Sequence, residues 1–382
     1  MGLKIYVPKE SRSGENRVAL TPSVVKQLIA EGFECYIEPD AGSGAGFSDE
    51  AYQGAGALIA GQSAAWAAAD VVLKVNPPSP DEVAQMKKGA VLISMMYAFS
   101  NPALVEACSR QGVTSFALDA VPRISRAQKM DVLSSQANLA GYKAVIIGAN
   151  EMGKIFPLLM TAAGTITPSK VLIFGAGVAG LQAVATAKRL GAVVEVTDVR
   201  PETKEQVESL GGKFLVVDSA EGIKTEGGYA REVSEDFLRK QKELVEKHIA
   251  QADLVITTAQ VFGRKAPVLI TEDMVRLMKP GSVIVDMAVE QGGNCSLSEA
   301  GKTVVNHGVK IVGQTNLPSL LPVNASELFA KNISTLLLHL GNGEGFKLDR
   351  EEEITKGCLI THDGQLVHES TKQLLNNAAQ SA

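Results

Sequence analysis

Cysteine and histidine are scarce in this sequence, and neither type is clustered. The 382 residues include four cysteines and five histidines, with no C-x-x-C pair and no H-E-x-x-H pattern. Zinc and similar sites need such clusters, so we predict that the chain binds no metal. Scattered cysteines without a preceding signal peptide are typical of free thiols in a reducing setting, which favours a cytoplasmic location.

Long apolar runs and dense blocks of basic residues are also missing. The uncharged segment 52–69 is interrupted by glycine and glutamine, and the segment 155–169 contains two prolines. The latter is also shorter than the roughly 20 apolar residues that a membrane-spanning helix needs. The net charge is −5, and no Lys/Arg cluster offers a footprint for nucleic acid. We therefore expect no membrane span and no nucleic-acid partner.

The chain alternates short apolar runs with helical patterns. Its length predicts two domains or three, and its 45% hydrophobic content allows sizeable cores. The rhythm predicts an α/β fold with two Rossmann-like doubly wound parallel-sheet domains, which helices join around a cofactor cleft. The expected strands are 3–7, 33–38, 71–75, 91–95 and 113–118 in the first domain, and 171–174, 193–197, 214–217, 254–258, 283–287 and 310–313 in the second.

Two helical segments are expected to connect the domains. One covers 134–163, with a possible kink at Pro157, and the other covers 325–340. The segment 355–368 has Asp-Gly at its centre, which predicts a hairpin, and the chain from 371 onward looks frayed. We expect residues 1–133 plus 321–382 to form the first domain and residues 134–320 to form an NAD-binding second domain.

The strongest motif lies in the segment 171–198. A G-x-G-x-x-G run formed by Gly175, Gly177 and Gly180 follows an expected strand and opens an expected helix. The first glycine allows the turn, the second lets a pyrophosphate approach the backbone, and the third lets the helix pack close to the strand. This register predicts dinucleotide binding at the helix N-terminus.

An acidic residue follows at the position that this fingerprint requires. Asp198 ends the next expected strand, about 20 residues on, where a carboxylate binds the adenosine ribose. Its charge would repel a 2′-phosphate, which favours NAD(H), although Arg200 weakens that preference. The predicted cofactor-binding residues of this domain are Gly175, Gly177, Val178, Ala179, Gly180, Asp198, Val199, Arg200, Gly228, Tyr229, Thr258 and Ala259.

A polar loop lies between the last strand of the first domain and the connecting helix. Arg123, Gln128, Asp131 and Ser134 could converge on an amide or a phosphate, because ligands bind at the carboxyl edge of α/β sheets. Equally, the loop could be solvated, with Asp131 or Ser134 capping the next helix.

Other candidate residues remain open between a site and a structural role. Lys74, at the end of an expected buried strand, could serve a site or snorkel to the surface. Tyr229, behind two glycines, could belong to a lid over a cofactor or to a disordered tip. Thr258, Ala259 and Glu290 follow expected strands and could line the nicotinamide side, although Glu290 could equally be a solvated acid.

Several longer motifs resemble one family over nearly the whole chain. They are Pro-Lys-Glu at 8–10, Glu-Asn-Arg-Val-Ala-Leu-Thr-Pro at 15–22, Pro-Arg-Ile-Ser-Arg-Ala-Gln at 122–128, Asp-Val-Leu-Ser-Ser-Gln-Ala-Asn-Leu-Ala-Gly-Tyr at 131–142, Phe-Gly-Ala-Gly-Val-Ala-Gly-Leu-Gln-Ala at 174–183 and Lys-Glu-Gln-Val-Glu-Ser-Leu-Gly-Gly at 204–212. On these motifs the chain resembles the NAD(H)-binding component of proton-translocating nicotinamide nucleotide transhydrogenase.

The resemblance implies a Re/Si-specific hydride transfer between NADH and NADP⁺, with NADP(H) held on a partner subunit. It implies that Arg123, Gln128, Asp131 and Ser134 contact the nicotinamide end, and that Gly228 and Tyr229 belong to a mobile loop. It further implies a homodimer that docks on membrane-spanning subunits, peripheral at the cytoplasmic face of the inner membrane and coupled through them to proton translocation.

The alanine dehydrogenases are related proteins and provide the main alternative. They share the contexts of Arg17 and Lys74, which bind the substrate there, and they use a histidine in the strand at 91–96. This chain has Ser-Met-Met-Tyr at 94–97, so the proton donor that reduction of an imine would need is missing. Hydride transfer between two nicotinamides needs no such donor, and Arg17 and Lys74 are then expected to be structural. A non-catalytic NAD(H)-binding module is the second alternative.

Overall fold

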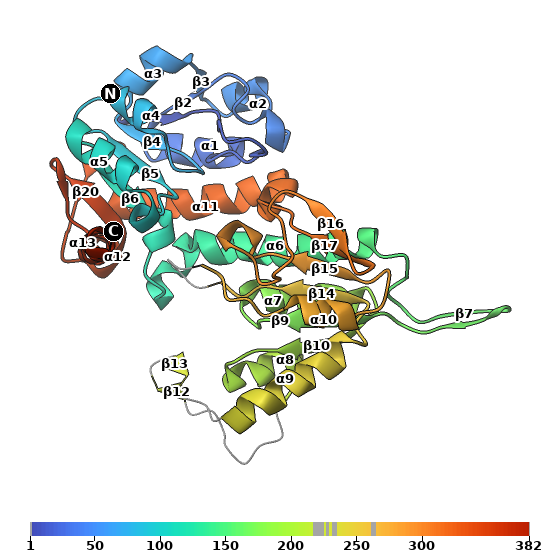
Figure 1. Cartoon of the computed structure of the whole chain (residues 1–382). Helices are drawn as coiled ribbons and strands as arrows, with labels where there is room; N and C mark the ends of the chain where they lie inside the picture. Colours follow the sequence, from blue (N-terminus) through green and yellow to red (C-terminus); the bar gives the residue numbers. More distant parts are fainter. Residues whose placement is uncertain (1, 217–224, 227–228, 231–234, 261–264, 382) are drawn as a thin grey trace. The chain divides into compact units, whose positions relative to one another are not determined.

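The chain forms two compact α/β units. The computed structural model describes all residues except 1, 217–224, 227–228, 231–234, 261–264 and 382. Unit 1 comprises Met1–Gln136 and Pro318–Ala382, and unit 2 comprises Ala137–Leu317. Each unit contains one large, mainly parallel sheet (Figure 1), which confirms the predicted fold class.

The sheet of unit 1 has the order β21-β20-β6-β5-β4-β1-β2-β3. Strands β1 to β6 run parallel, and β20 and β21 add an antiparallel hairpin beside β6. The strands are β1 (Lys4–Val7), β2 (Glu34–Ile37), β3 (Leu58–Ile59), β4 (Val71–Leu73), β5 (Val91–Ser94), β6 (Thr114–Ala117), β20 (Leu359–His362) and β21 (Gln365–Leu366). The helices are α1 (Pro22–Ala30), α2 (Asp49–Gly54), α3 (Gln62–Ala68), α4 (Pro80–Ala84), α5 (Pro102–Gln111), α11 (Pro322–Leu340), α12 (Glu353–Cys358) and α13 (Glu369–Ser381).

Apolar residues on both faces of this sheet explain its two covering layers. In β1, Ile5 and Val7 join the core that contains α11, whereas Tyr6 joins the core that contains α5. Successive side chains of a strand point to opposite faces, so a strand buried on both sides needs helices on both sides.

The end of the chain was predicted partly wrongly. The hairpin expected in 355–368 is confirmed by β20 and β21, but the frayed tail is instead helix α13. Thr371 is buried, and Lys372 Nζ donates a hydrogen bond of 2.8 Å to Glu369 Oε1. Packing of Thr371 and this contact within one turn stabilise a helix that the polar sequence of the segment did not predict.

The sheet of unit 2 has the order β11-β10-β9-β14-β15-β17-β16. Its first strand lies centrally and the order reverses there, as in doubly wound nucleotide-binding folds. The strands are β9 (Lys170–Phe174), β10 (Val193–Thr197), β11 (Lys213–Phe214), β14 (Leu254–Thr257), β15 (Val283–Asp286), β16 (Thr303–Asn306) and β17 (Val309–Val312). The helices are α6 (Val132–Glu151, which begins in unit 1), α7 (Val178–Arg189), α8 (Lys204–Ser209), α9 (Glu235–Ile249) and α10 (Glu272–Leu277).

Two elements of unit 2 differ from the prediction. Helix α6 ends at Glu151, and the expected helical segment continues as the hairpin of β7 (Leu159–Thr161) and β8 (Gly164–Ile166). Figure 1 shows this hairpin extending away from the sheet of unit 2. Pro157 cannot supply the backbone N–H that a continuing helix needs. The edge strand β16, which was not predicted, pairs antiparallel with β17, and its half-exposed residues lack the apolar run of a central strand.

All four cysteines are buried, and we expect them to be unreactive in the folded protein. Burial raises the pKa of Cys35, Cys108 and Cys358 to about 12 and also raises that of Cys295. Because the thiolate is the reacting form, a disulfide reagent near neutral pH should modify none of them until denaturant is added. Rapid modification of one thiol in the native protein would contradict this expectation.

Candidate functional site

The glycine turn connects β9 to α7. Gly175 has φ +99°, in the left-handed region that favours glycine. A Cβ on Gly180 would lie 1.9 Å from the carbonyl oxygen of Gly175, so only glycine lets α7 approach the turn. At Gly177 the nearest atom to an added Cβ would be Arg200 Nη2, 4.0 Å away. The space before Gly177 is therefore open, as the approach of a pyrophosphate requires.

The residues after Gly177 form the first turn of helix α7. Gly177 is the N-cap of α7 and makes no side-chain cap, and Val178, the first helical residue, is 41% exposed. The first N–H groups of a helix have no partner within the helix and attract anions. The backbone N–H groups of Val178 and Ala179 are therefore the donors that an anion at the N-terminus of α7 would meet.

Asp198 lies beside the turn, at the end of β10. Its Oδ2 accepts hydrogen bonds from Ala176 N at 2.6 Å and from Arg200 Nη2 at 2.9 Å. Its Oδ1 accepts from Arg200 N at 2.8 Å and Arg200 Nε at 3.0 Å. Burial raises the pKa of Asp198, but the hydrogen bonds from Arg200 and Ala176 outweigh burial and lower it. Val199, between the two charged residues, is 61% exposed.

The carboxyl end of β14 packs against the same turn. Thr258 Oγ1 donates to the carbonyl oxygen of Phe174 at 3.0 Å and to that of Gly175 at 3.3 Å. Ala259 exchanges two hydrogen bonds with the side chain of Asn294, through its N at 3.1 Å and its carbonyl oxygen at 2.9 Å. Asn294, which no sequence motif indicated, therefore fixes the backbone next to the glycine turn.

Asp286 ends β15 and is fully buried. Its carboxylate accepts hydrogen bonds from Thr257 Oγ1, Ala288 N, Cys295 N and Ser298 Oγ at 2.6–3.0 Å. Such saturation identifies a structural carboxylate. Glu290 is exposed, and its Oε2 accepts from Asn316 N at 3.0 Å.

In unit 1, the polar loop contains the 3₁₀ helix η4 (Ser125–Met130) and leads into α6. Asp131 Oδ1 accepts from Ser134 N at 2.8 Å, and Asp131 Oδ2 accepts from Ser134 Oγ at 2.5 Å. Asp131 thus caps the N-terminus of α6 together with Ser134, which is the structural role that the sequence left open beside a role in ligand binding. Arg123 and Gln128 are exposed, and neither side chain forms a hydrogen bond within the described residues.

The expected mobile loop is only partly covered. Gly228 lies outside the described residues. Tyr229 belongs to the two-residue strand β13 (Tyr229–Ala230), which pairs antiparallel with β12 (Thr225–Glu226).

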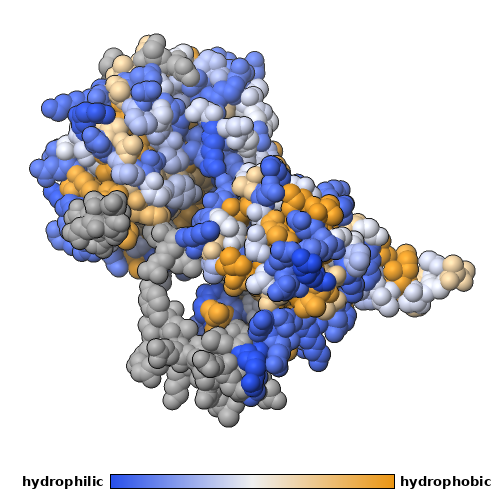
Figure 2. Space-filling view, viewed as in Figure 1, coloured by the Kyte–Doolittle hydropathy of each residue, from blue (hydrophilic) through white to orange (hydrophobic). Residues whose placement is uncertain are grey.

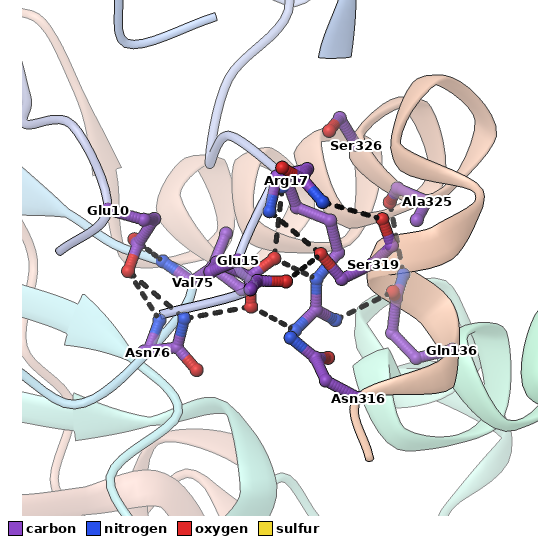
Figure 3. A network of polar contacts seen from close by, with 12 residues as sticks. Glu10, Glu15, Arg17, Val75, Asn76, Gln136, Asn316, Ser319, Ala325 and Ser326 are labelled. Carbon is purple, nitrogen blue, oxygen red and sulfur yellow. Dashed lines mark hydrogen bonds and ion pairs between the residues drawn. The ribbon is translucent and has the colours of Figure 1, made fainter. Parts of the chain in front are cut away.

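Arg17 lies in a polar network of unit 1 that short contacts hold together (Figure 3). Its Nε and Nη2 donate to the two carboxylate oxygens of Glu15 at 2.8 and 2.7 Å, and its Nη1 donates to Gln136 Oε1 at 2.9 Å. Asn76 Nδ2 donates to Glu15 Oε2 at 2.9 Å and to Glu10 Oε2 at 3.1 Å. The guanidinium is therefore already engaged by an internal carboxylate.

Lys74 is buried in unit 1, so the alternative of a snorkelling surface lysine is wrong. Its side chain is 1% exposed, and its Nζ donates to Glu82 Oε1 at 2.9 Å. The same Nζ lies 5.9 Å from the centroid of the Trp66 ring. An ion pair and a cation–π contact stabilise the buried charge.

Glu15 should make the protein sensitive to acid. Burial by itself raises the pKa of Glu15. The hydrogen bonds from Arg17 and Asn76 and the charge of Arg17 outweigh burial, so that the pKa falls from 4.5 to about 2. A carboxylate of lowered pKa stabilises the fold above its unfolded pKa, and this contribution is lost as pH falls toward the folded value. Between about pH 5 and pH 3 the stability gap between wild type and Glu15→Gln should shrink by about 2 kcal/mol. Urea unfolding of both proteins at each pH measures this difference in the free energy of unfolding.

Glu344→Gln, which removes an exposed carboxylate, is the control. If the stability difference between wild type and Glu344→Gln shrank equally over this pH range, the role of Glu15 would be contradicted.

The carboxyl end of β5 is followed by two methionines and not by a histidine. Met95 and Met96 are buried, and Asp119 accepts hydrogen bonds from Met96 N at 2.7 Å and Tyr97 N at 3.0 Å. Thioethers cannot donate a proton. Both carboxylate oxygens of Asp119 accept hydrogen bonds from backbone N–H groups, and burial raises the pKa of Asp119.

Two kinds of feature are missing from the described residues. No group of three or more His, Cys, Asp or Glu side chains is placed there to hold a metal ion. Over the same ranges of the chain, no helix has both the length and the apolar character needed to cross a bilayer.

Comparison with known proteins places these features in a family. The N-terminal domain of alanine dehydrogenase/PNT matches residues 6–140, and the C-terminal domain of alanine dehydrogenase/PNT matches residues 144–369. The first part of NAD(P) transhydrogenase subunit alpha from Rhodospirillum rubrum is 55% identical, over 96% of this chain and 98% of that protein. The crystal structure of transhydrogenase from Sinorhizobium meliloti superposes with a TM-score of 0.87 at 46% identity, covering 95% of this chain and 100% of that one. Alanine dehydrogenase of Bacillus subtilis is 33% identical, over 96% of this chain and 93% of that protein.

These matches confirm the resemblance seen in the sequence motifs. The chain therefore belongs to the alanine dehydrogenase/PNT family, and within it is more similar to NAD(P) transhydrogenase alpha subunits than to the alanine dehydrogenase of Bacillus subtilis.

Proposed function

We propose that this chain is the NAD(H)-binding component of a proton-translocating NAD(P)⁺ transhydrogenase. The observation that carries the proposal is the open space before Gly177, at the N-terminus of α7, beside a carboxylate at the end of β10. A dinucleotide presents a pyrophosphate next to a ribose, the two groups that a glycine turn and a carboxylate at the next strand end bind in this kind of fold. The identity of 55% to a transhydrogenase alpha subunit supports the assignment.

The residues around the turn have separate binding roles in this proposal. The backbone at Gly175, Gly177, Val178, Ala179 and Gly180 binds the pyrophosphate, and Asp198 binds the ribose. Val199 and Arg200 flank the adenosine, while Thr258 and Ala259 approach the nicotinamide side. Gly228 and Tyr229 belong to the loop that we propose covers the cofactor.

Hydride transfer depends on positioning. The bound dihydronicotinamide supplies the hydride, and NADP⁺ on a partner subunit accepts it. Arg123 and Gln128 have exposed polar groups that would orient the carboxamide of the nicotinamide. Asp131 and Ser134, held together at the start of α6, would fix that orientation. Orientation of two reactants can lower a barrier without an acid–base group.

The names of the relatives support a multi-subunit assembly. The Rhodospirillum rubrum protein is named as the first part of a subunit alpha, and a subunit is one component of a larger assembly. We propose NADP(H)-binding and membrane-spanning partners for this chain, which would hold it at the cytoplasmic face of the inner membrane and couple hydride transfer to proton translocation.

One experiment tests the proposed activity against the alternatives. The purified chain should bind NADH and, mixed with an NADP(H)-binding transhydrogenase subunit, should transfer hydride between the two cofactors. Oxidation of NADH with pyruvate and ammonia should be absent, because Arg17 is engaged by Glu15 and the methionines at β5 donate no proton. Robust turnover with pyruvate would favour an alanine dehydrogenase. Tight NADH binding without hydride exchange would favour a non-catalytic module.

We also propose that the chain forms a homodimer through the β7–β8 hairpin. Leu158, Leu159, Met160 and Ile166 of this arm are 56%, 43%, 72% and 44% exposed, and Figure 2 shows apolar side chains along it. Contiguous exposed apolar residues mark interfaces, and a second copy of the chain offers the same surface.

The hairpin predicts a change in oligomeric state. Met160→Ser combined with Ile166→Ser should convert the dimer to a monomer in sedimentation experiments, with little change in the melting temperature, because the hairpin packs on no core of its own unit. Val305→Ser, at a residue of β16 that is 64% exposed, is the matched control and should leave the dimer intact. A double variant that stays dimeric would exclude the hairpin as the interface.

A further inference from the structure

The carboxylate of Asp198 has no acceptor position left for a ribose. A carboxylate offers about four lone-pair sites, two on each oxygen. Oδ1 receives Arg200 N and Arg200 Nε, and Oδ2 receives Ala176 N and Arg200 Nη2. All four positions are filled by donors from the chain itself. The two hydroxyls of a ribose can bind Asp198 only if two of these donors move away from the carboxylate.

Only the two side-chain donors are free to leave. Ala176 is buried, and the turn before it is fixed by the hydrogen bond of Gly175 N to the carbonyl oxygen of Thr197 at 2.8 Å. The backbone of Arg200 is fixed through its carbonyl oxygen, which accepts from Thr203 N at 3.2 Å and Thr203 Oγ1 at 2.7 Å. The Arg200 side chain, by contrast, is 44% exposed, and rotation about its own bonds would release both contacts.

The guanidinium resembles the ligand that it would displace. Nε and Nη2 present two adjacent N–H donors, one to each carboxylate oxygen, as the 2′- and 3′-hydroxyls of a ribose present two adjacent O–H donors. The Nη2 atom is also the atom nearest to the open face of Gly177, 4.0 Å from the position of an added Cβ. The side chain therefore lies where the nucleotide is proposed to enter.

We propose that Arg200 is an internal ligand of Asp198 that occupies the ribose-binding positions in the free protein and sets the selectivity between NADH and NADPH. This inference rests on the proposed binding of NAD(H) to this turn. When a ribose diol binds, the guanidinium leaves the carboxylate but stays beside it, and its charge offsets part of the repulsion between Asp198 and a 2′-phosphate. Arg200 thus weakens NADH binding slightly and lessens the rejection of NADPH.

The magnitudes of the two effects differ. The ion pair is partly exposed and therefore weak, so Arg200→Ala should tighten NADH binding by about fivefold at most. An unneutralised carboxylate within several ångströms of a doubly charged phosphate repels it more strongly, and the ratio of the dissociation constants for NADPH and NADH should rise about tenfold. Arg200→Lys keeps the charge and should keep that ratio within about threefold of wild type.

Direct binding measurements with the purified full chain test the inference, using the fluorescence of NADH and NADPH. Arg276→Ala is the matched control, because Arg276 also forms an ion pair with a carboxylate, Glu272, on the surface of unit 2. It should change neither constant, and circular dichroism and melting temperatures should show that every variant is folded.

The outcomes separate the inference from the proposed function. If wild type fails to bind NADH, the proposed function itself is wrong. If wild type binds NADH but Arg200→Ala in a folded protein weakens that binding tenfold, Arg200 is a direct ligand and the inference is overturned. An unchanged NADPH-to-NADH ratio in Arg200→Ala overturns it as well. Tighter or equal NADH binding with a raised ratio, restored by Arg200→Lys, supports it.

Discussion

Gly177→Ala is expected to weaken NADH binding by about 100-fold while the protein stays folded. A methyl group at this position would meet no atom closer than 4.0 Å, and φ is −77°, which any residue adopts. The added group would instead fill the space proposed for the pyrophosphate. The loss then corresponds to one or two charge-assisted hydrogen bonds with the helix N-terminus, each worth about 1.5–3 kcal/mol.

Gly180→Ala provides the matched comparison within the same motif. Its Cβ would lie 1.9 Å from the carbonyl oxygen of Gly175, so the backbone of the turn or of α7 must shift. Overpacking of this kind costs about 3 kcal/mol or more and should lower the melting temperature by about 5–10 °C. Calorimetry and NADH titration of both variants separate the two roles. Normal NADH affinity in Gly177→Ala would show that the turn is structural and that the nucleotide binds elsewhere.

Asp131→Asn is expected to slow hydride transfer by about 100-fold, the order of loss that misplacement of a reacting group causes, while NADH binding changes less than about threefold. Asparagine keeps the oxygen that accepts from Ser134 N, so the cap of α6 persists. It removes the negative charge and alters the contact with Ser134 Oγ. If Asp131 positions the nicotinamide, the rate suffers and the affinity does not.

The measurement uses the complex with an NADP(H)-binding subunit, with single-turnover rates and NADH dissociation constants determined for each variant. Asp349→Asn is the control, since Asp349 is an exposed residue of unit 1 whose Oδ1 also accepts a backbone N–H, from Glu351 at 3.0 Å. Equal losses of rate and affinity in Asp131→Asn would contradict a positioning role. A lower melting temperature with an unchanged rate would leave Asp131 as a helix cap alone.

Local signals in the sequence were sufficient for most of the fold. The strand at 193–197 was predicted with the bounds that the structure has. Some helix ends also depend on single residues: Pro102 begins α5, and Gly112 ends it with φ +71°. The hairpin at 159–166 was missed because its strands pack on no core and therefore carry no alternation of apolar and polar residues.

The sequence by itself determined the α/β class, the glycine turn beside an acidic strand end, and the family, because each depends on residues near one another in the chain. Only the tertiary structure decided which charged groups are already engaged. Arg17 and Gln136 are 119 positions apart yet form a hydrogen bond, and Asn294 binds the backbone of Ala259 across 35 positions. Even at Asp198 and Arg200, two positions apart, the sequence showed opposite charges but not that one side chain fills the acceptor positions of the other. Hydrogen-bond saturation depends on atom positions within a few tenths of an ångström, which folding sets and residue spacing does not.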